Sequence, residues 1–121
     1  MFEISQRFFF DSAHTLRCEL EADSSRRVHG HTYHAEVFVQ GERDPDSGMV
    51  LDLGLIRREI ATVREQLDHH FLDEVPGLGV PTLENLCVYI WAALAPKLPG
   101  LAGVCVERHG MADKCSYRPG I

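Results

Sequence analysis

The chain has 121 residues, of which 45% are hydrophobic and 25% are charged, a composition typical of a globular protein and not of a disordered one. Twelve basic residues against eighteen acidic ones give a formal net charge of −6, whereas a nucleic-acid-binding protein usually carries a basic excess. We therefore expect a single domain over residues 1–121 that does not bind nucleic acid. A local basic mouth for an anionic small molecule is still compatible with this balance.

No segment suggests a membrane protein or a secreted one. The longest uncharged apolar stretch, Leu86 to Ala95, is far shorter than the roughly 20 residues of a transmembrane helix. The first residues lack a basic region followed by an apolar run, so we expect no signal peptide. The four cysteines include no Cys-x-x-Cys pair, and a chain with this much apolar material needs no disulfides. Together these features predict a cytoplasmic protein without membrane contact.

Hydrophobic patterns predict the elements in the order ββααββ. Phe2–Phe10 and His31–Glu42 alternate as strands do, and the polar segment Asp11–Val28 between them is interpreted as a long loop. Asp52 and Thr82 are candidate N-caps of two amphipathic helices. The apolar stripes of these helices are Ile56, Ile60, Val63 and Leu67 in the first, and Leu86, Ile90, Trp91 and Leu94 in the second.

A closing hairpin of Gly103–His109 and Lys114–Arg118 completes the pattern. Because the strands are segregated from the helices, the order predicts an α+β fold. We expect a four-stranded antiparallel sheet with both helices on one face.

The segment His29-Gly30-His31 is the sharpest chemical signal. Residues two apart in an extended segment point to the same face, so both imidazoles can bind one ion. His14 follows the first strand, which can pair beside the second. Three histidines with one open position are typical of a catalytic zinc site. His34 has the opposite parity and is excluded as a ligand, and a chance His-x-His in a histidine-rich loop is the alternative.

Two further features carry possible acid–base or binding chemistry. Asp68 and His69 lie at the end of the first helix, where the aspartate can orient the imidazole, although histidines at helix C-termini are also favoured by the helix dipole alone. Glu107 follows an apolar run in a predicted strand and could accept two N–H groups of a ligand, as it would from an arginine. The alternatives for Glu107 are pairing with Arg108 or Arg118, or simple solvation.

Six features in fixed order give the chain a recognisable family resemblance. It resembles the 6-pyruvoyltetrahydropterin synthase family, and within it the bacterial 6-carboxy-5,6,7,8-tetrahydropterin synthases of queuosine biosynthesis. The features are Phe10-Asp11-Ser12-Ala13-His14, His29-Gly30-His31, Gly48-Met49-Val50-Leu51-Asp52, Leu67-Asp68-His69-His70, Pro81-Thr82-x-Glu84-Asn85 and Glu107.

This resemblance implies the tunnelling fold, in which trimers close their sheets into a barrel and two trimers stack into a hexamer with active sites at subunit interfaces. It implies a lyase that converts 7,8-dihydroneopterin triphosphate to 6-carboxy-5,6,7,8-tetrahydropterin, acetaldehyde and triphosphate. By position, His14, His29 and His31 resemble the ligands of Zn²⁺, and Asp68 and His69 the acid/base dyad. Glu107 resembles the pterin anchor, and Thr82 and Glu84 the lining of the pterin pocket.

One position departs from the family pattern. The usual catalytic cysteine, four residues before His-Gly-His, is Ser25 here, and a serine hydroxyl is a far weaker base than a thiolate. Cys18, Glu21 and Asp23 are the nearest alternatives. This departure keeps two other functions open: a paralogue with altered chemistry on the same pterin, namely the pyruvoyl reaction or dihydroneopterin side-chain cleavage, and a pterin- or metal-binding protein without turnover.

Overall fold

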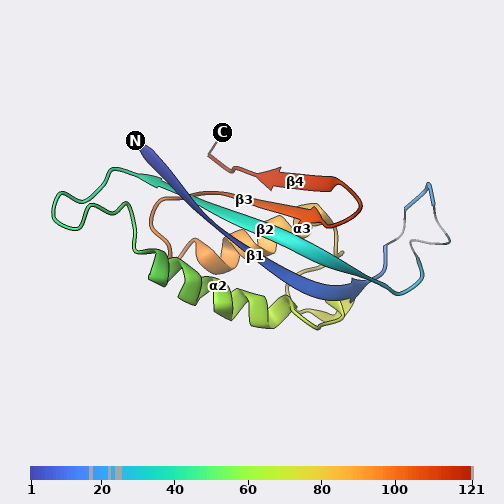
Figure 1. The fold of residues 1–121 in the computed structure, drawn as a ribbon. Coiled ribbons are helices and arrows are strands. Elements are labelled where there is room, and N and C mark those ends of the chain that lie inside the picture. Colours follow the sequence, from blue (N-terminus) through green and yellow to red (C-terminus); the bar gives the residue numbers. More distant parts are fainter. Residues whose placement is uncertain (17, 22, 24–25, 121) are drawn as a thin grey trace.

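The computed structural model describes residues 1–16, 18–21, 23 and 26–120. The elements are β1 (Phe2–His14), β2 (His29–Gly41), α2 (Leu53–Leu67), the short 3-10 helix η1 (Leu72–Glu74), α3 (Leu83–Leu94), β3 (Leu101–Arg108) and β4 (Asp113–Tyr117). This order confirms the predicted ββααββ arrangement (Figure 1).

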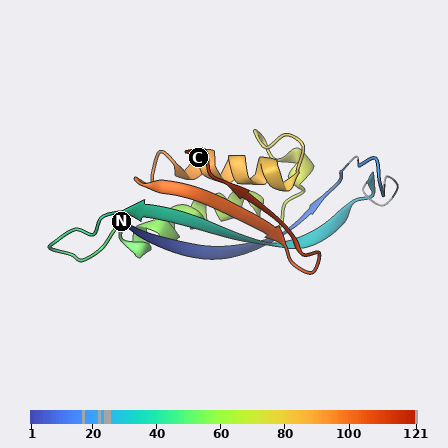
Figure 2. The ribbon, with the colours of Figure 1, turned by 90° about the horizontal axis from the view of Figure 1, so that it is seen from above.

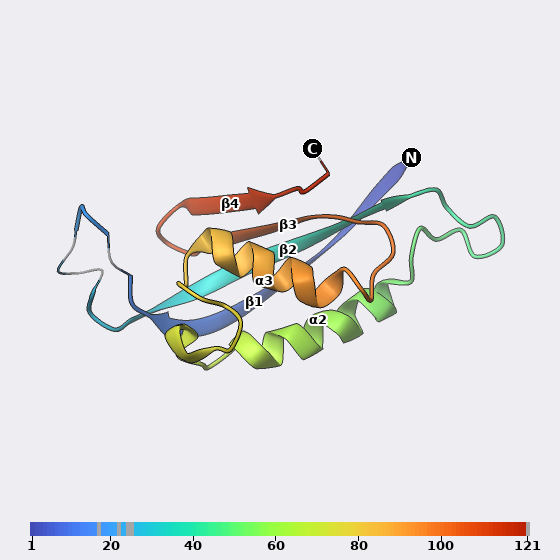
Figure 3. The same cartoon turned by 180° about the vertical axis from the view of Figure 1, so that it is seen from behind.

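The strands form one antiparallel sheet in the spatial order β1-β2-β3-β4. Helices α2 and α3 lie side by side against the same face of this sheet, which Figures 2 and 3 show from above and from behind. The prediction of an α+β fold with both helices on one face is confirmed. No helix within the described ranges is long and apolar enough to cross a membrane.

The core lies between this sheet face and the two helices. On β2 the buried side chains alternate along the strand, because successive residues point to opposite faces. These side chains are Tyr33, Ala35, Val37 and Val39, and they pack with the apolar stripes of the helices, which include Ile56, Ile60, Val63 and Leu67 of α2 and Leu86, Ile90 and Leu94 of α3. Burial of these stripes holds α2 and α3 on the sheet.

β1 is longer than the sequence predicts. The segment from Asp11 to His14, expected as the start of a loop, continues the strand and pairs with the first residues of β2. Local polarity misleads here because the polar side chains have tertiary partners: the Ser12 hydroxyl donates a hydrogen bond to the carbonyl of Leu67. The backbone N–H of Ala13 donates to the carbonyl of His70 over 3.2 Å. This extension brings His14 to the end of a rigid strand.

Candidate metal and active site

Three imidazoles meet where β1 ends and β2 begins. His14 pairs directly across the sheet with His29, and Ser12 pairs with His31. These residues share one face of the sheet, the face that carries the core. One ring nitrogen from each histidine lies within 4.8 Å of those of the other two. The structure thus brings the three predicted zinc ligands together within one chain.

The surroundings of this histidine cluster favour the neutral form of His14 and His31. His14 is only 1% exposed. Burial, followed by the charges of His29 and His31, lowers the pKa of His14 from 6.5 to about 4. Burial and then Arg108 also lower the pKa of His31. A neutral imidazole with a free lone pair is the form that binds a metal ion.

The hydrogen bonds of the cluster also suit a metal ion. Both ring nitrogens of His14, and Nε2 of His31, are buried and have no hydrogen-bond partner among the described residues. Buried polar atoms normally find a partner, so these nitrogens fit ligation. The Nδ1 of His29 donates to the backbone carbonyl of Arg27 at 2.6 Å, which leaves Nε2 as the ligand atom. His34 pairs with Phe9 across the sheet and points to the opposite face, as its parity predicts.

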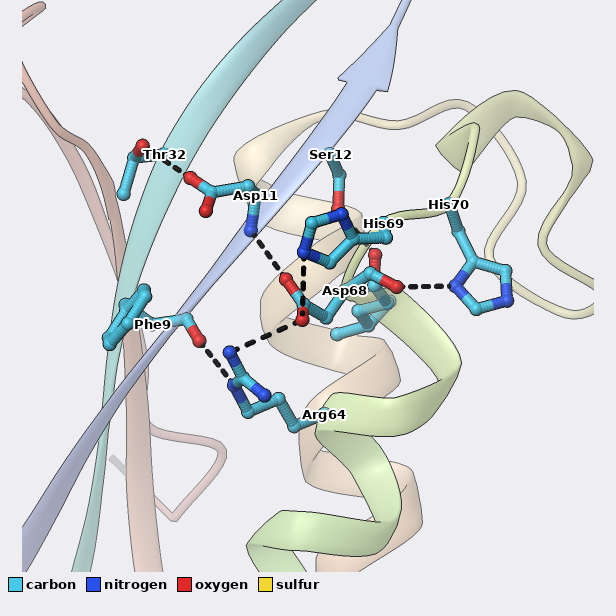
Figure 4. A network of polar contacts seen from close by, with 9 residues as sticks. Phe9, Asp11, Ser12, Thr32, Arg64, Asp68, His69 and His70 are labelled. Carbon is cyan, nitrogen blue, oxygen red and sulfur yellow. Dashed lines mark hydrogen bonds and ion pairs between the residues drawn. The ribbon is translucent and has the colours of Figure 1, made fainter.

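The dyad of Asp68 and His69 lies at the C-terminal end of α2, beside β1 (Figure 4). The carboxylate Oδ1 of Asp68 accepts from the backbone N–H of Asp11 at 2.9 Å, and Oδ2 lies 3.5 Å from Nε2 of His69. The backbone of His69 has φ 57° and its N–H donates to the carbonyl of Asp11. The side chain of His69 is 80% exposed, so its imidazole is oriented by Asp68 and remains free to meet a ligand.

Arg64 is a site residue that the sequence analysis missed. It lies one helical turn before Asp68, and its Nη2 is 3.2 Å from Asp68 Oδ2. Its Nε donates to the carbonyl of Phe9 at 2.7 Å, which ties α2 to β1 (Figure 4). The spacing of four residues between an arginine and an aspartate was the available signal. Arg64 therefore positions the carboxylate of Asp68, which in turn orients the imidazole of His69.

The histidine cluster and the dyad form separate groups in one chain. Asp68 and His69 come within 4.8 Å of Asp11, whose side chain lies on the opposite face of β1 from Ser12 and His14. His31 and His69 both line a shallow hollow along the end of β1. The structure therefore places the dyad at an open surface of the chain and the three imidazoles on the core side of the sheet.

Glu107 and Arg108 point to opposite faces of β3. Glu107 pairs with His34, and its side chain is exposed on the face that the helices do not cover. Arg108 pairs with Tyr33, on the face of the histidine cluster. Within one chain, the predicted pterin anchor is thus not brought to the histidines, whereas Arg108 is. An alternation of polar and apolar residues would have shown which face of the strand Arg108 occupies. The run Val104-Cys105-Val106 is apolar throughout, so the sequence carries no such signal.

The remaining predicted residues are Thr82 and Glu84 at the start of α3, and Ser25. Thr82 caps α3 by accepting from the N–H of Asn85 at 3.1 Å, and it lines a hollow with Thr15 and Asp73 next to His14. Glu84 is exposed in the first turn of α3. Ser25 lies outside the described residues.

Comparison with known proteins decides the family. The family model described as 6-pyruvoyl tetrahydropterin synthase matches residues 3–119. The chain belongs to this family. The resemblance inferred from the motifs is confirmed, and it covers almost the whole length of the chain.

Relatives within the family carry different activities in their names. The chain is 33% identical to a 6-carboxy-5,6,7,8-tetrahydropterin synthase of Synechocystis, covering 86% of this chain and 84% of that one. It is 34% identical to the human 6-pyruvoyl tetrahydrobiopterin synthase, covering 80% and 77%. It is 33% identical to a dihydroneopterin monophosphate aldolase of Pyrococcus furiosus, covering 80% and 78%.

A solved structure of the family has the same fold. The 6-pyruvoyl tetrahydropterin synthase of Caenorhabditis elegans superposes with a TM-score of 0.83 at 28% identity, covering 97% of this chain and 94% of that one. The tunnelling fold predicted from the motifs is thereby confirmed.

Proposed function

We propose that this protein is a zinc-dependent pterin lyase that converts 7,8-dihydroneopterin triphosphate and water to 6-carboxy-5,6,7,8-tetrahydropterin, acetaldehyde and triphosphate. The observation that carries the proposal is the histidine cluster of a member of this family, whose buried nitrogens lack hydrogen-bond partners in the part of the chain that the structure describes. The Synechocystis relative supports the carboxy product.

His14, His29 and His31 would hold the zinc ion. When bound, zinc supplies Lewis acidity that polarises the substrate's side-chain hydroxyls and acidifies the neighbouring C–H bond. His14 and His31 need no deprotonation at neutral pH to bind the ion, because burial lowers the pKa of both.

Asp68 and His69 would move the proton. Arg64 and the backbone N–H of Asp11 fix the carboxylate of Asp68. The contact of this carboxylate with Nε2 of His69 then orients the imidazole. An imidazole with a carboxylate beside it can accept a proton and return it within one turnover. The high exposure of the His69 side chain leaves Nδ1, the ring nitrogen that does not face Asp68, accessible to substrate.

We also propose that the protein assembles into a homo-oligomeric ring, with a hexamer of two trimers as the form. In the ring, Asp68 and His69 of one chain act on substrate held at the histidine cluster of a neighbouring chain. Within one chain the three imidazoles and the dyad fall into two clusters of ligand atoms, although His31 and His69 border a common hollow, and this grouping supports a site that the dyad of a neighbouring chain completes. Among the described residues, β4 and the first half of β1 also have no neighbouring strand on their outer edges, and ring closure covers such edges.

A second activity is favoured by one observation. Ser25 stands where the family's usual cysteine is expected, and a relative of similar identity is named as an aldolase of dihydroneopterin monophosphate. Side-chain cleavage of a dihydroneopterin is therefore the alternative reaction. This reaction would use the same homo-oligomeric ring, the same histidine cluster and the same dyad.

Product analysis tests both activities. The purified protein is loaded with zinc and incubated with 7,8-dihydroneopterin triphosphate, and the products are separated by chromatography. Acetaldehyde with triphosphate and the 6-carboxy pterin supports the proposed reaction. A hydroxymethyl pterin with an aldehyde fragment supports the alternative, and unchanged substrate would contradict both and favour a binding protein.

A further inference from the structure

Two buried hydrogen-bond donors beside the histidine cluster have no partner. The hydroxyl of Tyr33 and the Nε of Arg108 are buried, and neither makes a hydrogen bond to any described residue. Tyr33 is only 1% exposed and the side chain of Arg108 is 19% exposed. A buried donor without an acceptor is rare in a native protein, so both atoms point to a ligand.

The sheet register places these donors next to the predicted metal ligands. Tyr33 and Arg108 are direct partners across β2 and β3, so their side chains leave the same face. The ring of Tyr33 lies 5.7 Å from that of His31 and 6.2 Å from that of His14, measured between centroids. In addition to burial, Arg108 is near enough to lower the pKa of His14 and His31, so the guanidinium and the tyrosine lie on the histidine side of the sheet.

Asp113 holds the guanidinium in place. Its Oδ2 accepts from Nη2 of Arg108 at 2.6 Å, across the hairpin between β3 and β4. This ion pair uses one edge of the guanidinium and leaves Nε free. A fixed arginine loses less freedom on binding than a mobile one, so the pair presents a preorganised donor.

These donors favour a ligand that carries hydrogen-bond acceptors. Tyr33 and Arg108 both offer donors, and arginine has no acceptor at all. The exposed carboxylate of Glu107, which could take ring N–H groups, lies on the other face of the same strand. The carboxylates near the histidines are those of Asp73 and Asp113, which already accept from Thr15 and Arg108. Among the described residues, the side-chain groups beside the imidazoles that still lack a partner are therefore donors.

We propose that Arg108, assisted by Tyr33, binds the acceptor edge of the pterin ring, formed by carbonyl O4 and ring nitrogen N5. This inference rests on the proposed pterin substrate. A carbonyl oxygen beside an imine nitrogen on a fused ring is the pair of acceptors that arginine binds on guanine through O6 and N7. The assignment makes Arg108 a specificity-determining residue for the ring, oriented by Asp113.

Equilibrium binding tests the inference without turnover. The zinc-loaded protein is titrated with neopterin, which carries both acceptors, and with 5-deazaneopterin, in which a C–H group replaces N5. Ligand fluorescence reports binding. Loss of one acceptor from a bidentate pair should weaken binding by the wild-type protein on the order of tenfold or more. The Arg108→Gln variant should bind neopterin about 10- to 100-fold more weakly and should no longer distinguish the two ligands.

Matched variants make the result specific. Arg58→Gln removes an exposed arginine of α2 that contacts only Glu59 among its described partners, and it should keep the wild-type preference. Zinc content and circular dichroism report whether Arg108→Gln is folded. If it is not, the comparison of the two ligands on the wild-type protein still decides.

Three results would overturn the inference. Equal binding of the two ligands by the wild-type protein is the first, and unchanged neopterin binding by Arg108→Gln is the second; both leave the proposed function standing. A loss of neopterin binding in Glu107→Gln but not in Arg108→Gln is one case of this second result. The third result, no pterin binding by the wild-type protein at all, would overturn both the inference and the proposed pterin substrate.

Discussion

His29 is half-buried, unlike the buried His14, and its replacement tests the metal site with little damage to the core. We expect His29→Ala to lose most of its zinc, because two imidazoles hold the ion far less tightly than three. Elemental analysis of the purified protein measures this. His34→Ala is the matched control, since His34 is on the other face of the sheet, and it should keep about one zinc per chain. Undiminished zinc in His29→Ala would contradict the site.

His14 predicts how the stability of the metal-free protein depends on pH. Its pKa is about 4 in the folded chain and 6.5 in the unfolded chain, so the unfolded state binds more protons below pH 6.5. The stability linked to His14 is present above pH 6.5 and is lost as the pH falls toward 4. Between pH 7 and pH 5 we expect a loss of roughly 2 kcal/mol from this residue.

Urea unfolding at the two pH values measures this loss. Other groups also titrate in this range, so the informative quantity is the difference between the wild-type protein and His14→Gln, which cannot titrate. The variant should be less sensitive to acid than the wild-type protein. An equal drop in both proteins would show that His14 is not the buried neutral imidazole described here.

The residues of the acid–base step predict a ranking of activities. The hydroxyl of Ser25 does not ionise readily near pH 7, so Ser25→Ala should lower turnover by less than about tenfold, or roughly 1.4 kcal/mol in the barrier. His69→Ala should cost roughly a hundredfold or more. Ser25→Cys restores the family's thiol and should raise activity if position 25 lies near the bound substrate.

Rates on the proposed substrate give this ranking. His70→Ala is the matched control for His69→Ala, because the neighbouring imidazole contacts only the backbone carbonyl of Asp68 among its described side-chain bonds. A dead Ser25→Ala with an active His69→Ala would mean that the family's division of roles does not hold in this chain.

The first turn of α3 separates a structural role of Thr82 from a binding role. Its hydroxyl accepts from the N–H of Asn85, as expected for an N-cap. Thr82→Ala should therefore lower the free energy of unfolding by about 1 kcal/mol, measured by urea denaturation. Thr62→Ala, an exposed site within α2, is the control and should not lower stability, because alanine has the higher helix propensity. Unchanged stability with weakened pterin binding would instead favour the predicted substrate contact.

The elements differ in how well the sequence predicts them. The helices were predictable because Asp52 and Thr82 cap them as their side chains suggest, and because their apolar stripes recur at helical spacing. The end of β1 was not, because Asp11 and Ser12 look like loop residues until their partners on α2 are known. Tertiary hydrogen bonds of this kind leave no local signal.

The site was predictable where a single strand carries the pattern. His29 and His31 share a face by parity alone, and His14 needs only the pairing of two neighbouring strands. The faces of Glu107 and Arg108 depend on the register between β2 and β3, and Cys105 is buried although it has the parity of the exposed Glu107. When a strand is apolar on both faces, its sequence does not show which residues point to which face. The position of Arg108 beside the histidines was therefore found only in the structure.

At the scale of the whole molecule, the outer strands of the sheet and the sheet face that the helices leave open bear on the proposed assembly. Phe9 lies on the open face of the sheet and is 50% exposed, and Phe2, at the start of the edge strand β1, is 47% exposed. A ring of copies would cover both. Light scattering at micromolar concentration should therefore give the mass of several chains. A monodisperse monomer would contradict the proposed ring.

Mixing two inactive variants tests whether the ring shares its sites. His29→Ala damages the histidine cluster but keeps the dyad, and His69→Ala does the reverse. If each site takes its histidines from one chain and its dyad from the next, random mixing of equal amounts restores one in about four sites. After the variants are unfolded together and refolded, activity should rise to about a quarter of that of the wild-type protein. The same protein refolded as separate variants is the control, and no recovery on mixing would place all the catalytic groups within one chain.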